Sequence, residues 1–419
     1  MKTKTVTTII IGAGPAGLAM SHHLTGRSID HVVLERGRVV ERWHSERWDS
    51  LRLLTPNWQT RLPGWHYGGA DPDGYMTMPE ITGFLGSFAE SISAPVQTET
   101  TVTSVSTDPT RDDGYRVVTD RGVWTCRSVV VATGATGRPV IPGFNTEVPP
   151  SVQQIAPSSY RNPDQLADDG VLVVGASASG LQLANELQQS GRPVTLAVGT
   201  HARVPRTYRG MDIQWWLNAT GALDLKFDQV RDIETARRAP SLQLVGTPDH
   251  KDLNLDILAE RGVRLAGHLT DIEDGTARFA GDLTTSCEAA DASEQRLLDR
   301  IDLWIEANGL TTEVLPARRT TTWTPGSGPE SVSLKQRGIG TILWATGYRQ
   351  HNPWLHVPVT DQLGNIRHRG GITDAPGLYV LGLPFLRRRK STFLDGFGAD
   401  AADLADHLAH HLNQVATAV

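Results

Sequence analysis

The chain has 419 residues, of which 39% are hydrophobic and 21% charged, and its formal net charge is −6 at pH 7. This length allows two or three domains, and the weak negative charge gives no reason to expect binding to nucleic acid or an anionic membrane. Because no apolar run approaches the ~18 residues that cross a bilayer, the amino terminus resembles no signal peptide, and the two cysteines form no CxxC pair, we expect a cytoplasmic protein without a transmembrane segment or metal site.

The first pattern along the chain is a dinucleotide-binding unit. A buried strand pattern at 8–11 is followed by the sequence GAGPAG at 12–17, which opens a helical stretch. A second apolar strand at 31–34 then ends in Glu35. This order of strand, glycine turn, helix, strand and acid is typical of proteins that bind a dinucleotide.

Each glycine of this turn has a predicted role. Gly12 permits the tight turn, Gly14 leaves room for a pyrophosphate, and Gly17 lets the helix pack closely on the strand. The pyrophosphate would lie at the helix N-terminus, where free N–H groups and the helix dipole favour an anion, and the acid would bind ribose hydroxyls. The predicted contacts are Gly12, Gly14, Pro15, Ala16, Gly17 and Glu35.

Residues 36–65 are rich in tryptophan and arginine and follow neither a helix nor a strand period. We expect a long ordered loop with one short helix, a kind of segment that is usually functional. The functional hypothesis is that the loop covers a flat aromatic cofactor and that its arginines face phosphate, with contacts from Arg36, Arg42 and Trp43. A tryptophan-rich packing cluster is the alternative.

A helix is predicted at 80–92, and alternating residues over 96–131 predict a small antiparallel meander. The last strand of this stretch ends in Ala132-Thr133-Gly134, small residues that let the backbone pass close to a bound nucleotide. We predict further cofactor contacts at Val102, Ala132, Thr133 and Gly134.

The same organisation begins again at residue 171, with a strand, the sequence GASASG at 175–180, a helix and a strand at 194–198. Here the middle glycine is replaced by Ser177, and the second strand ends without an acid. A missing carboxylate with arginines nearby suits the 2′-phosphate of NADPH better than the ribose of NADH. The predicted contacts are Gly175, Ser177, Ala178, Ser179, Arg203 and Arg206; a solvated arginine face is the alternative.

The C-terminal part alternates between short elements and loops. We expect a hairpin over 263–279, an amphipathic helix at 294–307, a loop at 311–331, and a strand at 339–344 that again ends in Ala-Thr-Gly. A strand at 377–382 and a helix at 395–413 follow. The added cofactor contacts are Ala345, Thr346, Gly347 and Asp395.

Together these patterns predict an α/β fold with two dinucleotide-binding (Rossmann-like) domains and small antiparallel meanders. The expected division is an FAD-binding domain at 1–150, an NAD(P)H-binding domain at 151–334, and a return to the FAD-binding domain at 335–419.

This architecture resembles that of flavin-containing monooxygenases that keep FAD and NADPH on one polypeptide. The sequence is more similar still to bacterial predicted FAD-dependent oxidoreductases, which share the runs RWDSLRLLTPNW and LPFLRRRKSTF. The residues that carry the resemblance are GAGPAG with Glu35, Arg42-Trp43, Leu51-Arg52-Leu53, ATG at 132–134, GASASG at 175–180 and ATGY at 345–348.

Two departures from the family pattern concern oxygen chemistry. The fingerprint FxGxxxHxxxW that precedes the second glycine turn is absent, and Leu54 occupies the position of the family's flavin-facing asparagine or histidine. The resemblance therefore places Leu54 near the flavin and leaves Thr55 and Asn57 as the candidate catalytic hydrogen-bond donors. Lys390, Asp395 and His368 are further candidates beside the ring, against the plainer interpretation of surface charge and helix capping.

The resemblance implies a monooxygenase that consumes NADPH and dioxygen and inserts one oxygen into a small-molecule substrate by N- or S-oxygenation, hydroxylation or Baeyer–Villiger oxidation. An NAD(P)H:acceptor reductase and a flavin-binding redox sensor are the alternatives. The lack of a CxxC pair argues against a dithiol reductase. Homodimer formation and the identity of the substrate stay open.

Overall fold

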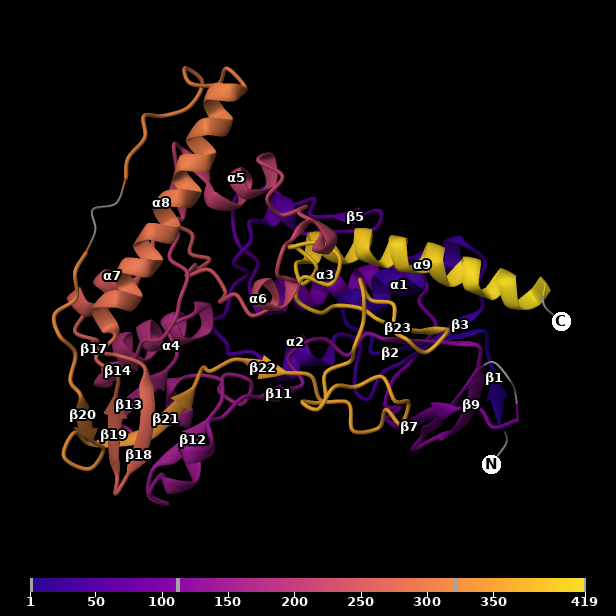
Figure 1. The fold of residues 1–419 in the computed structure, drawn as a ribbon, viewed down its shortest axis with the longest axis horizontal. Helices are drawn as coiled ribbons and strands as arrows, with labels where there is room; N and C mark the ends of the chain where they lie inside the picture. The colour runs from indigo at the N-terminus through magenta and orange to yellow at the C-terminus, as the bar shows by residue number, and fades with distance from the viewer. Residues whose placement is uncertain (1–2, 111–113, 320–322, 418–419) are drawn as a thin grey trace.

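Two lobes, each built on a five-stranded sheet, make up the described part of the chain (Figure 1). The structure is a computed structural model that describes residues 3–110, 114–319 and 323–417. The predicted α/β class with parallel sheets and an antiparallel meander is confirmed.

The first sheet has the strand order β23-β10-β2-β3-β6, and its neighbouring strands are all parallel. Ile11, Leu34 and Val131 lie beside one another at its carboxyl edge. The turn after residue 11, Glu35 and Ala132 therefore meet at this edge, as the sequence predicts. The strands are β2 (Thr8–Ile11), β3 (His31–Leu34), β6 (Val96–Gln97), β10 (Ser128–Val131) and β23 (Leu378–Val380).

Helices α1 (Pro15–Gly26) and α9 (Leu394–Thr417) lie side by side on this sheet, with α3 (Met78–Ser91) next to α1 (Figure 1). Helix α3 begins at a capping box in which Thr77 and Glu80 satisfy each other's backbone N–H groups. The meander consists of β7 (Val102–Thr107), β8 (Tyr115–Thr119) and β9 (Gly122–Cys126), and β1 (Lys4–Thr5) joins its edge.

The second sheet has the order β12-β21-β13-β14-β17 and is also parallel. Its strands are β12 (Gln153–Ile155), β13 (Gly170–Val174), β14 (Val194–Ala197), β17 (Arg264–Ala266) and β21 (Ile339–Trp344), and α4 (Ala178–Gln189) packs against β13 and β14. The expected return to the first domain at residue 335 is wrong for β21, because this strand pairs with β12 and β13 in the second sheet.

The shorter elements connect the lobes or cover their edges. An antiparallel sheet of β18, β19 and β20 borders the second lobe, and the pair β11 and β22 lies between the lobes (Figure 1). The bounds are α2 (Glu41–Ser45), β4 (Arg61–Leu62), β5 (Trp65–His66), β11 (Arg138–Pro139), β15 (Thr207–Tyr208), β16 (Met211–Asp212), α5 (Ile213–Ala219), α6 (Ile233–Arg237), α7 (Leu255–Glu260), β18 (Leu269–Glu273), β19 (Thr276–Phe279), β20 (Ser331–Ser333) and β22 (Tyr348–Arg349).

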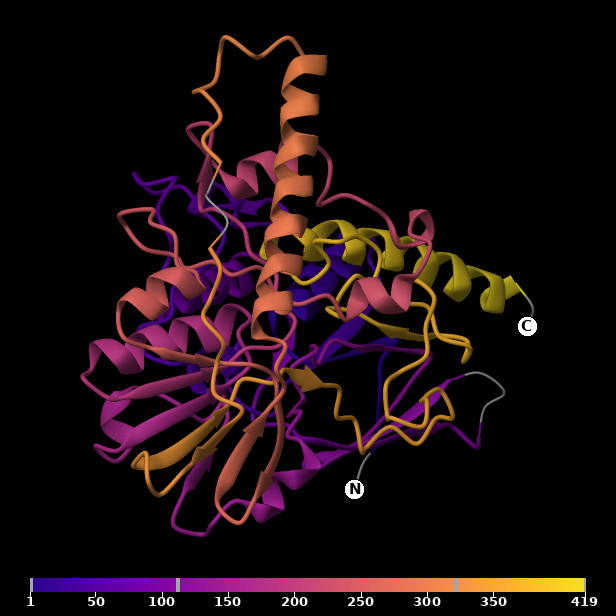
Figure 2. The same ribbon diagram turned by 60° about the vertical axis from the view of Figure 1, so that its left-hand side comes forward.

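The longest helix that the structure describes, α8 (Leu283–Ala307), has 25 residues and projects beyond both sheets (Figures 1 and 2). It begins well before the predicted start at 294. Its first turns carry small and polar residues, and their buried positions, Cys287, Ala290 and Asp291, give little apolar periodicity. Among the described residues, no helix is long and apolar enough to cross a membrane.

Candidate cofactor and substrate site

The first glycine turn forms one wall of a cavity of about 420 Å³, called here the glycine-turn cavity. Gly12 has φ +106°, and a Cβ built on it would lie 2.7 Å from the carbonyl oxygen of Ala132. A Cβ on Gly17 would lie 1.9 Å from the carbonyl oxygen of Gly12. Both positions therefore require glycine, as the sequence predicts.

Gly14 is constrained differently, because a Cβ built on it meets no protein atom within 4 Å. It is the N-cap residue of α1, no side chain caps that end, and the first turn carries no acidic residue. The helix N-terminus thus faces open space with unpaired N–H groups and the positive end of its dipole. This cradle fits the pyrophosphate of a dinucleotide such as FAD.

Glu35 is buried and lines the same cavity. One carboxylate oxygen accepts the Ala13 N–H at 2.9 Å, and the other accepts the Gly37 N–H at 3.0 Å. These bonds fix the carboxylate beside the turn. Its predicted bond to ribose hydroxyls stays a prediction.

Most of the predicted FAD contacts come together around this cavity. The lining includes Gly12, Gly14, Pro15, Ala16, Glu35, Arg36, Arg42, Trp43, Val102, Ala132, Thr133 and Gly134. Arg42 also forms an ion pair with Glu46 at 3.2 Å. His351, Trp354, Thr392 and Phe397 line the cavity as well and were not among the predicted residues.

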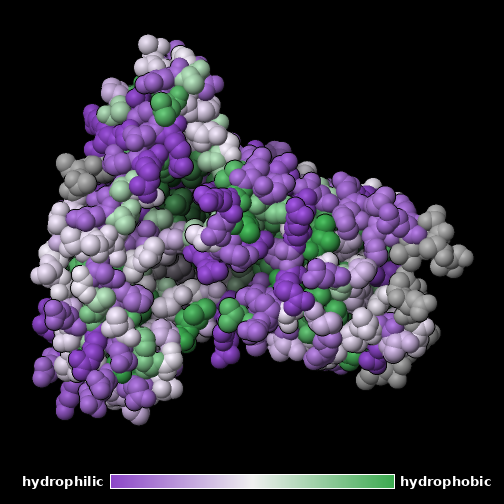
Figure 3. All heavy atoms as spheres, viewed as in Figure 1, coloured by the Kyte–Doolittle hydropathy of each residue, from purple (hydrophilic) through white to green (hydrophobic). Residues whose placement is uncertain are grey.

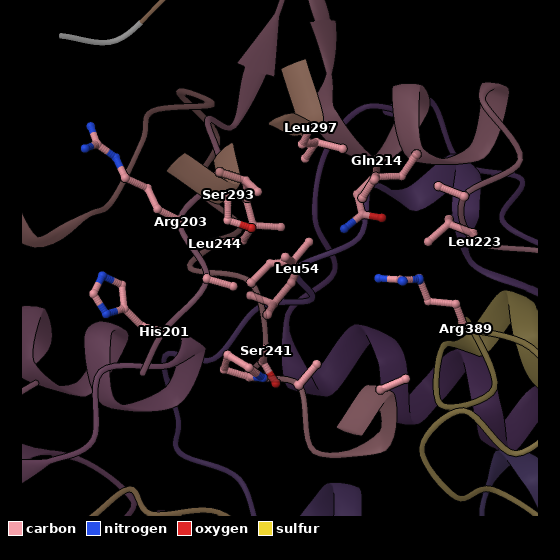
Figure 4. Close-up of a pocket in the computed structure, with 18 of the residues that line it drawn as sticks. Leu54, His201, Arg203, Gln214, Leu223, Ser241, Leu244, Ser293, Leu297 and Arg389 are labelled. Carbon is pink, nitrogen blue, oxygen red and sulfur yellow. The ribbon is translucent and has the colours of Figure 1, made fainter. Parts of the chain in front are cut away.

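A larger cavity of about 1400 Å³ lies between the lobes and is called here the interlobe cavity (Figures 3 and 4). One wall comes from residues 53–55 and 384–394 of the first lobe, and the other from residues 200–204 and α8 of the second. Trp43 and Thr392 line both cavities. The two cavities therefore meet at these two side chains.

The second glycine turn repeats the geometry of the first. Gly175 has φ +103°, and its Cβ would lie 2.5 Å from the carbonyl oxygen of Ala345. A Cβ on Gly180 would lie 1.8 Å from the carbonyl oxygen of Gly175. Ser177 is the N-cap residue of α4 without a side-chain cap bond, so this helix end also presents unpaired N–H groups. The predicted contacts Ala178, Ser179, Thr346 and Gly347 belong to this turn and to the strand end opposite it.

Comparison with known proteins assigns the chain to a family. Residues 9–220 match the family described as pyridine nucleotide-disulphide oxidoreductase. The chain is also 30% identical to a protein of Geobacillus kaustophilus named uncharacterized oxidoreductase CzcO-like, over 97% of this chain and 99% of that protein.

The chain belongs to the pyridine nucleotide-disulphide oxidoreductase family.

Solved structures agree with this assignment at the level of the fold. A flavin-containing monooxygenase from Stenotrophomonas maltophilia superposes with a TM-score of 0.68 at 18% identity, covering 98% of this chain and 100% of that one. Indole-3-pyruvate monooxygenase YUCCA1 of rice is 30% identical over 48% of this chain and 50% of its own length. The predicted resemblance is confirmed, and this family member is an FAD-dependent oxidoreductase. FAD and NADPH, the predicted cofactors, are those of this enzyme class.

The structure gives Arg203 protein partners of its own. This side chain is buried, and it pairs with Asp291 at 2.7 Å and with Glu294 at 3.2 Å, both on α8. Binding of a 2′-phosphate, as predicted from the sequence, would have to compete with these carboxylates. The arrangement favours a structural role that attaches α8 to the second sheet.

Arg206 is likewise buried and engaged. Its guanidinium group pairs with Asp212 and donates to the carbonyl oxygen of Leu54 at 2.9 Å. Tyr75 donates to the other oxygen of Asp212 at 2.8 Å. These bonds connect Leu54 and Tyr75 of the first lobe to the second lobe. Arg206 therefore positions Leu54 and does not face an open phosphate site.

The two candidate catalytic residues differ in where they lie. Thr55 lines the interlobe cavity, as do Leu54 and Trp43. Asn57 is buried away from that lining, where its amide accepts the Met76 N–H and donates to the carbonyl oxygen of Asp71, both at 2.9 Å. This arrangement favours a structural role for Asn57 over the predicted catalytic one, because both polar atoms of its side chain hold a turn together.

We expect Asn57→Ala to lower the free energy of unfolding by about 1–3 kcal/mol, because it leaves a buried N–H and C=O unpaired. Hydrogen peroxide released per NADPH should stay at the wild-type value. Denaturant titration and a peroxide assay measure the two quantities. A large rise in peroxide at unchanged stability would restore the catalytic assignment.

Asp395, Lys390 and His368 do not line the glycine-turn cavity or the interlobe cavity. Asp395 pairs with Arg61 at 2.9 Å and with Lys390 at 3.0 Å, at the start of α9. Their predicted places beside the cofactor are corrected accordingly: the carboxylate and ammonium groups neutralise each other and join α9 to the β4–β5 hairpin.

His368 accepts the Gly371 N–H at 3.2 Å, and burial, followed by the positive charge of Arg237, lowers its pKa from 6.5 to about 4. The unfolded chain therefore takes up a proton between pH 6.5 and pH 4 that the folded chain does not. Stability present above pH 6.5 is lost as the pH falls through this window. His368→Asn, which keeps an acceptor, should show a shallower loss of stability. Urea unfolding at a series of pH values measures this loss. The prediction is contradicted if the free energy of unfolding falls equally steeply with pH in the variant and the wild type.

Proposed function

We propose that the protein is an FAD-dependent monooxygenase that consumes NADPH and oxygenates a small molecule in the interlobe cavity. The observation that carries the proposal is the junction of the two cavities at Trp43 and Thr392. A substrate in the larger cavity could reach a flavin held in the smaller one there. The first lobe would hold FAD, and the second lobe, including β21, would hold NADPH.

The overall reaction balances as substrate, O₂, NADPH and H⁺ giving oxygenated substrate, NADP⁺ and water. Bound FAD supplies the redox chemistry of this reaction, accepting hydride and activating dioxygen. The chain's own residues bind and orient the reactants. The turn at Gly14 receives the pyrophosphate, Trp43 packs at the cavity junction, and Leu54 excludes water from it.

Thiol chemistry has little support, although disulfide reductases share this fold. The chain has two cysteines, and both Cys126 and Cys287 are buried and outside the linings of the two cavities. Burial raises the pKa of Cys287 to about 11, which disfavours the reactive thiolate. The structure thus offers no cysteine pair beside the flavin position.

The alternative is an NAD(P)H:acceptor reductase that uses the flavin without oxygen insertion. Support for oxygenation comes from the size of the interlobe cavity and from relatives whose names include monooxygenase, among them YUCCA1 of rice. Such relatives match about half of this chain.

Anaerobic reduction followed by exposure to air separates these functions. For a monooxygenase we expect NADPH to bleach the flavin and, with substrate present, peroxide to fall well below the NADPH consumed. If the amount of hydrogen peroxide formed equals the amount of NADPH consumed with every substrate tried, the protein is a reductase. Failure of NADPH to reduce the flavin would contradict both enzymatic functions.

A further inference from the structure

The interlobe cavity carries positive charge without a matching acid at the end that lies beside the C-terminal half of α8. Arg296 and Arg300 lie one turn apart on α8 and line the cavity. Arg389 reaches the same cavity from residues 384–394 of the first lobe, as Figure 4 shows. No ion pair is recorded for these three arginines among the residues that the structure describes. The other two arginines of the lining, Arg203 and Arg237, have carboxylate partners.

Acids that lie close to this cluster along the chain pair with other cations, and Asp224 pairs with Lys390, the residue after Arg389, at 3.0 Å. Asp299 and Asp302 lie on another side of α8, where both pair with Arg319. Among the described residues, Asp282 is the only acid of the cavity lining, and it stands at the first turn of α8, accepting the His268 N–H at 2.9 Å. At 1.5 Å per residue it is roughly 27 Å along the helix from Arg300.

The positive charge of Arg300 acts on Arg389, which lines the same cavity from the other lobe. Desolvation lowers the pKa of the Arg389 guanidinium below its usual value although part of the residue reaches solvent, and the positive charge of Arg300 lowers it further. Guanidinium groups are cationic at neutral pH. An anion placed between them would relieve this repulsion.

The walls beside the cluster are apolar. Side chains of both lobes contribute: Leu54, Leu223 and Leu297, which Figure 4 labels, together with Leu217, Leu225, Trp304, Phe385 and Phe393. Such walls suit the hydrocarbon or aromatic body of a ligand, and the guanidinium groups suit a carboxylate or sulfonate.

We propose that this end of the cavity binds the anionic group of an amphipathic small-molecule substrate, with Arg300 and Arg389 holding the anion and Arg296 adding charge. The proposal rests on the proposed function for what happens to that substrate. The 2′-phosphate of NADPH is the other possible source of an anion. It is disfavoured because the second strand of the nucleotide unit ends at Ala197, and Gly199 just after it lies against His268, which binds Asp282 at the opposite end of α8.

Binding to the oxidised holoenzyme tests the proposal without turnover. Three anions, 4-(methylthio)benzoate, dodecanoate and 2-naphthalenesulfonate, are compared with neutral partners, the methyl esters of the two acids and 2-naphthalenesulfonamide. Calorimetry should show at least one anion binding about tenfold more tightly than its neutral partner. If none of the three does so, the proposal is overturned.

Variants assign the effect to the cluster. Arg300→Gln and Arg389→Gln should each weaken the anion about tenfold and leave its neutral partner unchanged, and Arg300→Lys should restore most of the binding. Arg318→Gln, at an exposed arginine outside the cavity lining, is the matched control and should bind as wild type. Loss of NADP⁺ binding by the same factor would instead assign the cluster to the nucleotide. Tight binding without oxygenation would contradict the proposed function and leave the anion site standing.

Discussion

Gly14→Val is expected to yield a folded protein that binds no FAD. The backbone of Gly14 is extended, with φ −77° and ψ 177°, and open space surrounds its Cβ position, so valine fits the chain itself. Its methyl groups would occupy the cradle that receives the pyrophosphate. Flavin content per protein should fall to near zero, with the circular dichroism spectrum of the wild type.

Two variants of the same helix are controls for this result. Gly26→Val changes the other end of α1, where a Cβ again meets nothing within 4 Å, and should keep its flavin. Gly17→Val should fail to fold, because its Cβ would overlap the Gly12 carbonyl. Full flavin content in folded Gly14→Val would show that this turn does not hold the cofactor.

The second large effect is expected from Arg203→Ala. Exposed fractions of the side chains are 9% for Arg203, 10% for Asp291 and 1% for Glu294, so removal of the arginine leaves two carboxylates buried without their cation. Breaking a buried ion pair in this way costs about 3–5 kcal/mol of unfolding free energy. Urea unfolding of the holoenzyme measures the loss.

A neutralised triple variant separates this effect from nucleotide binding. Arg203→Met combined with Asp291→Asn and Glu294→Gln removes all three charges, and we expect it to regain much of the lost stability. If Arg203→Ala instead keeps wild-type stability and raises the KM for NADPH alone, the guanidinium group serves the 2′-phosphate, as the sequence first suggested.

The sequence predicts well those features that depend on neighbours along the chain. Gly12 and Gly17 could be assigned because a turn between a strand and a helix leaves no room for Cβ, and the same reasoning identified Gly175. The short helix at α2 and the meander followed from local patterns in the same way.

Features that depend on distant residues could not be predicted. The carboxylates that neutralise Arg203 lie on α8, far along the chain, and the carbonyl that engages Arg206 belongs to the other lobe. Asn57 attracted a catalytic assignment because its amide type fits one, yet its partners are backbone groups of a turn. Thr392 stands in a run that the resemblance marked, LPFLRRRKSTF, but only the folded chain brings it beside Trp43.

Oxygenation of a bound substrate is the central claim, and isotope transfer tests it most directly. Holoenzyme, NADPH and 4-(methylthio)benzoate are mixed under ¹⁸O₂, and the product is examined by mass spectrometry. We predict a sulfoxide carrying one ¹⁸O atom. The NADPH consumed should equal the sum of labelled sulfoxide and released hydrogen peroxide. Consumption of NADPH with all of its electrons recovered as hydrogen peroxide, and no label in the bound thioether, would contradict the account.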